Sequence, residues 1–428
     1  MRFASDTPTH VSVQGEGGET ISTPKNGVYK YLGFWLDSQL TGEIHAQRAM
    51  ARGRGKLFTV ASIAKRMGED LAIWYVKAKV VPKMIFGLEL APAWRKTLAA
   101  KADKVLGDLI QEALMVGPIS TWWEGSQPRV NKNTLHVEAG VMQISSIVEQ
   151  RKLGLINNIA ADTTTLAGSL FHAKSSGVGW PNMWLRETTN LSQSLLGTHW
   201  QTMGAKGSKA KDALKAKIKA RMWQEQGARN LQALHLRQPT WYGRQSNAVN
   251  IEGMRTYANP PPKQPTLVEQ WKTWVPNFHN RVFLRRMKMG CIPGLKANRA
   301  KYGASRDPVS HMTFPEKAQW VKCACGLGSG IHDPTHFFYE CAETDRAREE
   351  AANKATSALQ KLGGADMVTW SGWSIHTKNQ HMLTHTQKLS DKAERLVRSA
   401  GAEVWVDHAK MLSEQWQQED NSTPQVET

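Results

Sequence analysis

The chain of 428 residues has only four cysteines, far too few for a fold that disulfides hold together. It also lacks any apolar run near the roughly 18 residues that a membrane-spanning helix needs. Its first residues, MRFASDTPTHVSVQ, contain no hydrophobic core of a secretion signal. These absences predict an intracellular protein that is neither secreted nor embedded in a membrane.

Motifs of known catalytic sites are missing as well. The sequence has no Walker A loop, no GxGxxG followed by a helix, no HExxH, no GxSxG and no Asp-Asp dipeptide. A two-metal polymerase or nuclease site needs several carboxylates that converge on Mg²⁺. The acidic residues that could be considered are isolated from one another, and we interpret them as helix caps or surface residues: Asp37, Glu43, Asp70 and Asp108. The residues alone therefore identify no catalytic group.

Acidic residues are scarce beside basic ones. The chain has 55 lysines and arginines against 37 aspartates and glutamates, so its formal net charge is +18. Basic side chains displace counterions from a phosphate backbone, which makes RNA or DNA the first expected partner. A membrane surface or an acidic protein could use the same charge. The hydrophobic fraction of 40% excludes a fully disordered chain, and the length suits roughly two or three domains.

The first part of the chain predicts a β-hairpin followed by a helical bundle. Within residues 1–42, Val28, Tyr29 and Tyr31 favour strands, and Gly33 permits a sharp bend. Residues 43–170 show apolar side chains at spacings of three and four, which is typical of amphipathic helices. One such predicted face comprises Leu98, Ala102, Val105, Leu109 and Ala113, and another comprises Leu71, Trp74, Tyr75 and Ala78, before Pro82. We expect a mostly α-helical protein.

Residues 171–269 are rich in Gly, Ser, Asn and Pro and are interpreted as a linker. A basic helix is expected inside it at 206–223, with Leu214, Ile218 and Met222 on one face. Its lysines, candidates for phosphate contact, include Lys209, Lys211, Lys215 and Lys219. A solvated surface helix is an equal alternative to a phosphate-tracking one. A calmodulin-type or anionic-membrane helix is a lesser option.

The last part of the chain is predicted to combine a basic segment, a metal site and further helices. Residues 270–350 carry the candidate nucleic-acid contacts Arg285, Arg286 and Lys288. Residues 351–428 predict C-terminal helices and a polar tail.

Three of the four cysteines lie within nineteen residues of one another. Cys323 and Cys325 are followed after ten residues by His336 and after four more by Cys341. Thiolate and imidazole ligands at such spacings suit a tetrahedral zinc ion, and four protein ligands indicate a structural site. Gly326, Gly328 and Gly330 would let the backbone fold round the ion. The alternative to a metal site is a cluster of buried thiols without a metal. His332 is the alternative to His336 as the imidazole ligand. Cys291 is interpreted as a core thiol.

Several segments resemble, in order, the reverse transcriptases of non-LTR retrotransposons. YKYLGFWLDSQL at 29–40 is similar to the hairpin just beyond the palm, and VKAKVVPKMIFGLEL at 76–90 is similar to a thumb helix. Residues 134–160 resemble the helical region that follows. RVFLRRMKMGCIPG at 281–294 resembles the Arg-rich turn before the terminal zinc knuckle. The knuckle itself is matched by Cys323, Cys325, His336 and Cys341.

This resemblance implies a nucleic-acid-binding role. Tyr31, Leu32 and Gly33 would shape a primer-grip hairpin, and the thumb helices would hold a duplex by its backbone. The knuckle would bind RNA or target DNA and stack a base on Phe337, Phe338 or Tyr339, with packing beneath the zinc site as the alternative. A nuclear location is implied too.

In this family the catalytic aspartates lie upstream of the hairpin, and here only about 28 residues precede it. The resemblance therefore implies the C-terminal portion of such an enzyme, inactive as a polymerase alone. One alternative is an active RNA-directed DNA polymerase whose palm comes from another chain or an upstream exon. Another is a domesticated remnant with a structural or protein-binding role.

Overall fold

The structure is a computed structural model, and it is mostly helical, as the sequence predicts. No helix among the residues it describes is both long and apolar enough to span a bilayer. The described residues are 12–14, 20–22, 28–31, 33–37, 42–91, 96–116, 132–161, 180–197, 209, 212–218, 220–221, 224–225, 267–288, 311–327, 336–383 and 388–422.

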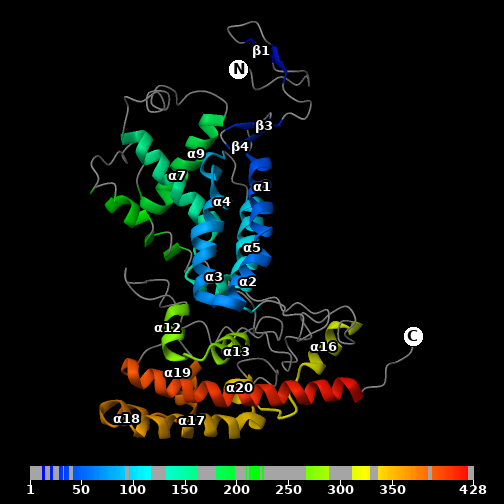
Figure 1. Ribbon diagram of the computed structural model, residues 1–428, viewed down its shortest axis with the longest axis vertical. Coiled ribbons are helices and arrows are strands. Elements are labelled where there is room, and N and C mark those ends of the chain that lie inside the picture. The colour runs from blue at the N-terminus through cyan, green and yellow to red at the C-terminus, as the bar shows by residue number, and fades with distance from the viewer. Residues whose placement is uncertain are drawn as a thin grey trace. The chain divides into compact units, whose positions relative to one another are not determined.

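Two short antiparallel strand pairs lie near the N-terminus (Figure 1). β1 (Ser12–Gln14) pairs with β2 (Thr20–Ser22), and β3 (Val28–Tyr31) pairs with β4 (Phe34–Asp37). Gly33 turns between the latter two with a φ of 86°, a left-handed conformation that other residues rarely adopt. The predicted hairpin is confirmed, and the predicted bend lies at Gly33.

The chain divides into two compact units, and each takes several separate stretches of sequence. The first comprises 1–59, 75–109 and 142–226, and the second comprises 60–74, 110–141 and 227–428. Three of the boundaries between the units fall inside helices, namely α2 (Leu57–Met67), α3 (Glu69–Tyr75) and α5 (Lys96–Ala113). The boundaries expected from composition do not include such interleaving.

In the first unit α1 (Glu43–Arg54) packs beside α4 (Val81–Ile85) (Figure 1). A π-helical turn, η1 (Val76–Val80), leads into α4, and the 3-10 turn η2 (Leu88–Leu90) follows it. α7 (Ile144–Ala161) contacts η2 and α9 (Trp180–Leu196). Ile218 is buried against this α7 and α9 cluster, and Leu214 is partly buried there, as expected for the apolar face of the basic helix.

One of the two predicted helix faces in this region is correct and the other is wrong. The face predicted on α5 is buried, with exposed fractions of 6% or less at Leu98, Ala102, Val105, Leu109 and Ala113. In the segment before Pro82, however, Leu71 and Trp74 are exposed, whereas Ile73, Val76 and Val80 are buried. Ile73, Val76 and Val80 follow one another at spacings of three and four as well, so the spacing alone did not distinguish the buried face from the exposed one.

The second unit contains α6 (Lys132–Ala139), α12 (Leu267–Trp274), α13 (Phe278–Lys288), α16 (Phe314–Trp320), η4 (His336–Glu340), η5 (Ala342–Thr344), α17 (Asp345–Gln360), α18 (Gly364–Ser371), α19 (Ile375–Leu383) and α20 (Asp391–Ser422). Its central contact is that of α17 lying along α20 (Figure 1). Ala347, Ala351 and Ala355 form a stripe of small side chains at intervals of four, and each is buried. Small residues at these positions let the two helices approach closely.

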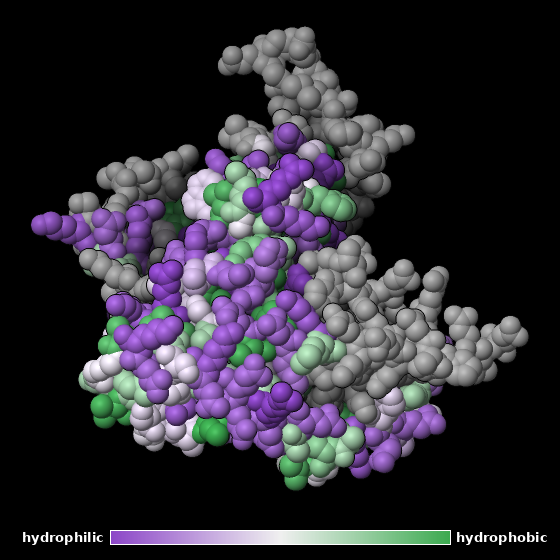
Figure 2. Space-filling view, turned by 60° about the horizontal axis from the view of Figure 1, so that its bottom comes forward, coloured by the Kyte–Doolittle hydropathy of each residue, from purple (hydrophilic) through white to green (hydrophobic). Residues whose placement is uncertain are grey.

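The core of the second unit joins residues from 271 to 409. The basic segment and the C-terminal helices, which composition separates, therefore share one core. Hydrophilic side chains cover most of the described surface in view in Figure 2, and hydrophobic ones form small separate patches. The large aromatic side chains of this core, Trp274, Phe337, Phe338, Trp370 and Trp405, are all buried.

A charged triad lies within that core. Glu394 accepts hydrogen bonds from His381 at 3.0 Å and from Arg398 at 2.7 Å, and all three side chains are buried. Burial opposes ionisation, but the bond from His381 and the charge of Arg398 outweigh it and lower the pKa of Glu394 to about 2. The Arg398 guanidinium also lies 3.9 Å from the Trp274 ring centre. The triad fixes α20 against α19 and α12.

Candidate metal centre

The two N-terminal ligands of the Cys/His cluster lie on a turn that follows α16. A capping box begins this helix, because the Thr313 amide and hydroxyl both donate to Glu316, at 2.6 and 2.8 Å. After the helix, the Gly326 amide donates to the Cys323 carbonyl at 3.4 Å and closes a tight turn. Gly326 has a φ of 65°. The predicted use of a glycine next to the thiols is confirmed at this position, whereas Gly328 and Gly330 lie outside the described residues.

The other two ligands lie at the two ends of the π-helical turn η4. The Cys341 amide donates to the His336 carbonyl at 2.8 Å, a bond that spans five residues. This wider turn brings His336 and Cys341 to the same side of the backbone, which explains the four-residue gap between them in the sequence. His332 and Cys291 lie outside the described residues.

The four ligand atoms converge. Each of Cys323, Cys325, His336 and Cys341 offers one atom, and all of these atoms lie within 4.8 Å of one another. The Cys323 and Cys341 sulfurs are 3.6 Å apart, and the Cys325 sulfur is 3.1 Å from His336 Nε2. Two thiolates on a tetrahedral zinc, with Zn–S bonds of about 2.3 Å, would be about 3.8 Å apart. The cluster is therefore close enough to bind a metal ion.

The surroundings of the cluster hold its ligands in place. His336 Nδ1 lies 3.3 Å from Glu340, so Nε2 is left to face the three sulfurs. Arg348 on α17 is buried and donates to the Cys341 carbonyl at 2.7 Å and to the Thr344 hydroxyl at 2.7 Å. Thr344 in turn donates to the Phe337 carbonyl at 2.7 Å. These bonds connect the cluster to α17.

Burial gives the thiols an unfavourable environment for ionisation in the absence of a cation. It raises the pKa of Cys341 to about 12 and also raises the pKa of Cys323. At Cys325, burial is outweighed by hydrogen bonds from the Leu327 and Ala342 amides, and the pKa is lowered. A bound metal ion would hold all three as thiolates.

The aromatic residues beside the cluster are interior residues. Phe337 and Phe338 are completely buried and meet Trp405 of α20 at ring-centre distances of 5.8 and 5.0 Å. Neither ring is open to a stacked base, so the structure corrects that expectation and assigns both to packing beneath the cluster. Tyr339 packs against the same core.

The Arg-rich segment is also largely internal. Arg285 is 3% exposed, and its guanidinium lies 3.4 Å from Glu138 and 3.7 Å from Glu69. Its neighbour Arg281 donates to Glu69 at 2.5 Å. The expected phosphate contact of Arg285 is thus corrected, because its charge is neutralised inside the second unit. Arg286 is half-buried and donates to the Met115 carbonyl at 2.8 Å, and the side chain of Lys288 is not described.

The remaining predicted contacts belong to the hairpin and the basic helix. Lys209 and Lys215 are exposed, whereas Lys211, Lys219 and Leu32 lie outside the described residues. Gly33 lies in the hairpin turn, and for Tyr31 only the backbone is described.

A junction around His45 was not predicted. The Trp35 amide donates to His45 Nδ1 at 3.2 Å, so Nε2 carries the proton and donates to the Phe86 carbonyl at 2.6 Å. Phe34 stacks on the imidazole at 4.1 Å, and burial lowers the pKa of His45. The neutral ring therefore fastens the hairpin to the turn at Phe86 and Gly87. A lone histidine in a helical segment gives no sequence signal for such a role.

No protein-family model, curated protein or solved structure matches the chain. The likeness to reverse transcriptases therefore stays a prediction from the sequence. The structure itself establishes the convergence of the four ligand atoms and the contacts of the His45 junction.

Proposed function

We propose that the chain binds nucleic acid as the palm-edge, thumb and zinc-knuckle portion of a non-LTR retrotransposon reverse transcriptase. The observation that carries the proposal is the His45 junction. Two segments that resemble this family, 29–40 and 76–90, are distant in sequence, yet His45 holds Trp35 of one and Phe86 of the other. The two segments that carry the resemblance are thus neighbours in the fold, which supports reading them as parts of one unit.

The charge of the chain supports a nucleic-acid ligand. A net charge of +18 favours phosphate, and the exposed side chains Lys209 and Lys215 belong to the basic helix of the first unit. Contacts of this kind give affinity and register without reading sequence. A nuclear site of action is part of the same proposal.

The metal in this proposal is zinc in a structural role. Cys323, Cys325, His336 and Cys341 are the soft ligands that zinc takes in closed four-coordinate sites. Three of the four are buried and the fourth is half-buried, which leaves no evident open position for a substrate. The bound ion would hold the α16 turn and the η4 turn to the core formed by α17 and α20.

The nucleic-acid proposal is tested by fluorescence anisotropy of the full chain with three labelled ligands of equal length. These are an RNA–DNA hybrid, a DNA duplex and a single-stranded RNA. We expect the hybrid to bind most tightly, since a thumb closes on a primer–template. Heparin serves as the polyanion control. Equal affinity for heparin fragments of matched charge and for the hybrid would contradict the proposal.

A further inference from the structure

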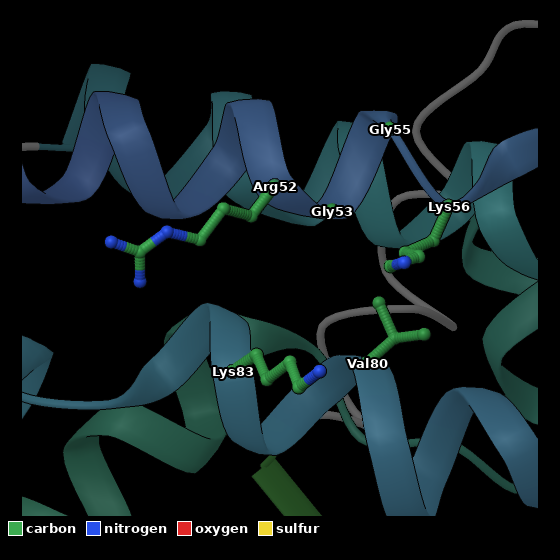
Figure 3. A pocket seen from close by; sticks show the side chains of 6 residues that line it. All are labelled: Arg52, Gly53, Gly55, Lys56, Val80 and Lys83. Carbon is green, nitrogen blue, oxygen red and sulfur yellow. The ribbon is translucent and has the colours of Figure 1, made fainter.

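A small cavity of about 290 Å³ lies between α1 and α4 in the first unit. Its lining residues are Arg52, Gly53, Gly55, Lys56, Val80 and Lys83. Figure 3 shows the side chains of Arg52, Lys56 and Lys83 extending into the space between the two helical segments. None of the six lining residues is acidic.

Three local features bring the cations together. Arg52 lies in the last turn of α1, and Lys56 follows the C-cap residue Gly55, with its amide donating to the Gly53 carbonyl at 2.9 Å. Val80 ends the π turn η1, and Lys83 follows three residues later on the same side of α4. Wide turns of this kind inside helices are frequent at functional sites.

Gly53 of α1 lies next to Met84 of α4. A Cβ atom at this position would lie 2.6 Å from the Met84 sulfur, so a larger residue would force the Met84 side chain to move. Arg52 and Lys56 from the end of α1 and Lys83 from α4 line the same cavity, and in Figure 3 the Arg52 guanidinium points away from the two lysines. The chain thus gathers like charges instead of separating them.

These like charges are not neutralised within the part of the chain that the structure describes. No ion pair joins Arg52, Lys56 or Lys83 to an acid among the described residues. Arg52 instead adds to the lowering of the His45 pKa, after the effect of burial. Three cations that line one cavity without a carboxylate repel one another, and an anion bound beside them would reduce that repulsion.

We propose that this cleft, defined by Arg52, Lys56 and Lys83, holds a phosphate group of a nucleic-acid backbone. The inference rests on the proposed function and assigns it a contact site. Arg52, Gly55 and Lys83 are exposed, so the cavity opens at the surface, and its volume of about 290 Å³ lies at the low end of small-molecule pockets. It therefore suits one charged group at the edge of a long ligand better than an enclosed cofactor. Arginine and two lysines supply charge-assisted donors for the phosphate oxygens.

The test compares two triple variants of the full chain, binding a labelled DNA duplex. The cleft variant is Arg52→Gln, Lys56→Gln and Lys83→Gln. The control variant removes the same charges from exposed positions of the second unit, with Arg346→Gln, Lys361→Gln and Lys392→Gln. Far-UV circular dichroism checks that both are folded. Each lost charge-assisted contact changes affinity by about tenfold or more, so the cleft variant should bind at least about tenfold more weakly. The control should change by less than about threefold, because these three side chains line no part of the cleft and salt screens exposed charges.

The salt dependence separates the possible outcomes. A lost phosphate contact should reduce the slope of log affinity against log salt by about 0.9 in the cleft variant alone. Equal behaviour of both variants, with wild-type binding intact, would overturn the cleft and leave the proposed function standing. Failure of the wild type to bind any nucleic acid would overturn the proposed function itself. In a second arm, vesicles of anionic phospholipid are offered, and a loss confined to vesicle binding would assign the cleft to a lipid headgroup and overturn the proposal.

Discussion

Gly87 allows the sharpest prediction about the hairpin junction. Its φ is 75°, and a Cβ atom there would lie 2.5 Å from Cδ2 of the Phe34 ring. Gly87→Ala would therefore combine two costs. A left-handed conformation costs alanine about 1–2 kcal/mol, and overpacking against a ring held by His45 costs about 1–3 kcal/mol more. We expect a loss of about 2–5 kcal/mol in the free energy of unfolding of the first unit.

Gly197 provides the matched control in the same unit. Its φ is 68°, but nothing lies within 4 Å of its would-be Cβ atom. Gly197→Ala should therefore lose only the conformational part, about 1–2 kcal/mol. Urea denaturation followed by circular dichroism gives both values, and hydrogen exchange of the α1 amides shows whether the loss is local. Equal losses for the two variants would refute the packing of Phe34 against Gly87 and with it the junction.

Three further predictions concern charged and metal-binding groups. Because burial lowers the pKa of His45, the neutral imidazole stabilises the fold, and the free energy of unfolding should fall as the pH drops below 6.5, the ordinary pKa of histidine. A His45→Gln variant should lose that pH dependence in urea titrations. Glu394→Gln leaves Arg398 buried with a weakened partner and should destabilise the second unit by about 3–5 kcal/mol. In the wild type, the contribution of ionised Glu394 to the free energy of unfolding should be lost as the pH falls from about 4.5 toward 2. Cys325→Ser should lower the bound zinc measured by mass spectrometry, and chelation should lower the melting temperature of the wild type; equal zinc content in both proteins would remove Cys325 from the site.

Local patterns predicted the elements that depend on neighbouring residues. The face of α5 follows from a regular spacing of three and four, and the ligand set at 323–341 follows from spacing that suits one metal ion. The hairpin follows from β-branched and aromatic residues on either side of Gly33. In each case the deciding interaction lies within about twenty residues.

The failures come from segments with two possible apolar faces and from distant partners. The segment at Leu71 and Trp74 was assigned the wrong buried face because Ile73, Val76 and Val80 have the same spacing of three and four on another side of the helix. Arg285 was expected at the surface because charged side chains are usually exposed. Its acidic partner Glu138 is 147 residues away, and no local pattern reveals that pairing.

The same limit applies to the residues that hold the metal centre and the hairpin. Arg348 and His45 make contacts that depend on the way turns and helices meet. Neither position carries a motif. Their roles could be recognised only once the backbone placed a carbonyl or a ring beside them.

The measurement that tests the central claim most directly is the salt dependence of hybrid binding by the full chain. Affinity for a labelled RNA–DNA hybrid is measured between about 50 and 200 mM salt, and log affinity is plotted against log salt concentration. The account predicts a steep line, whose slope falls by about 0.9 for each phosphate contact that the protein makes. A flat line would contradict the claim that this chain, with its net charge of +18, binds a nucleic-acid backbone.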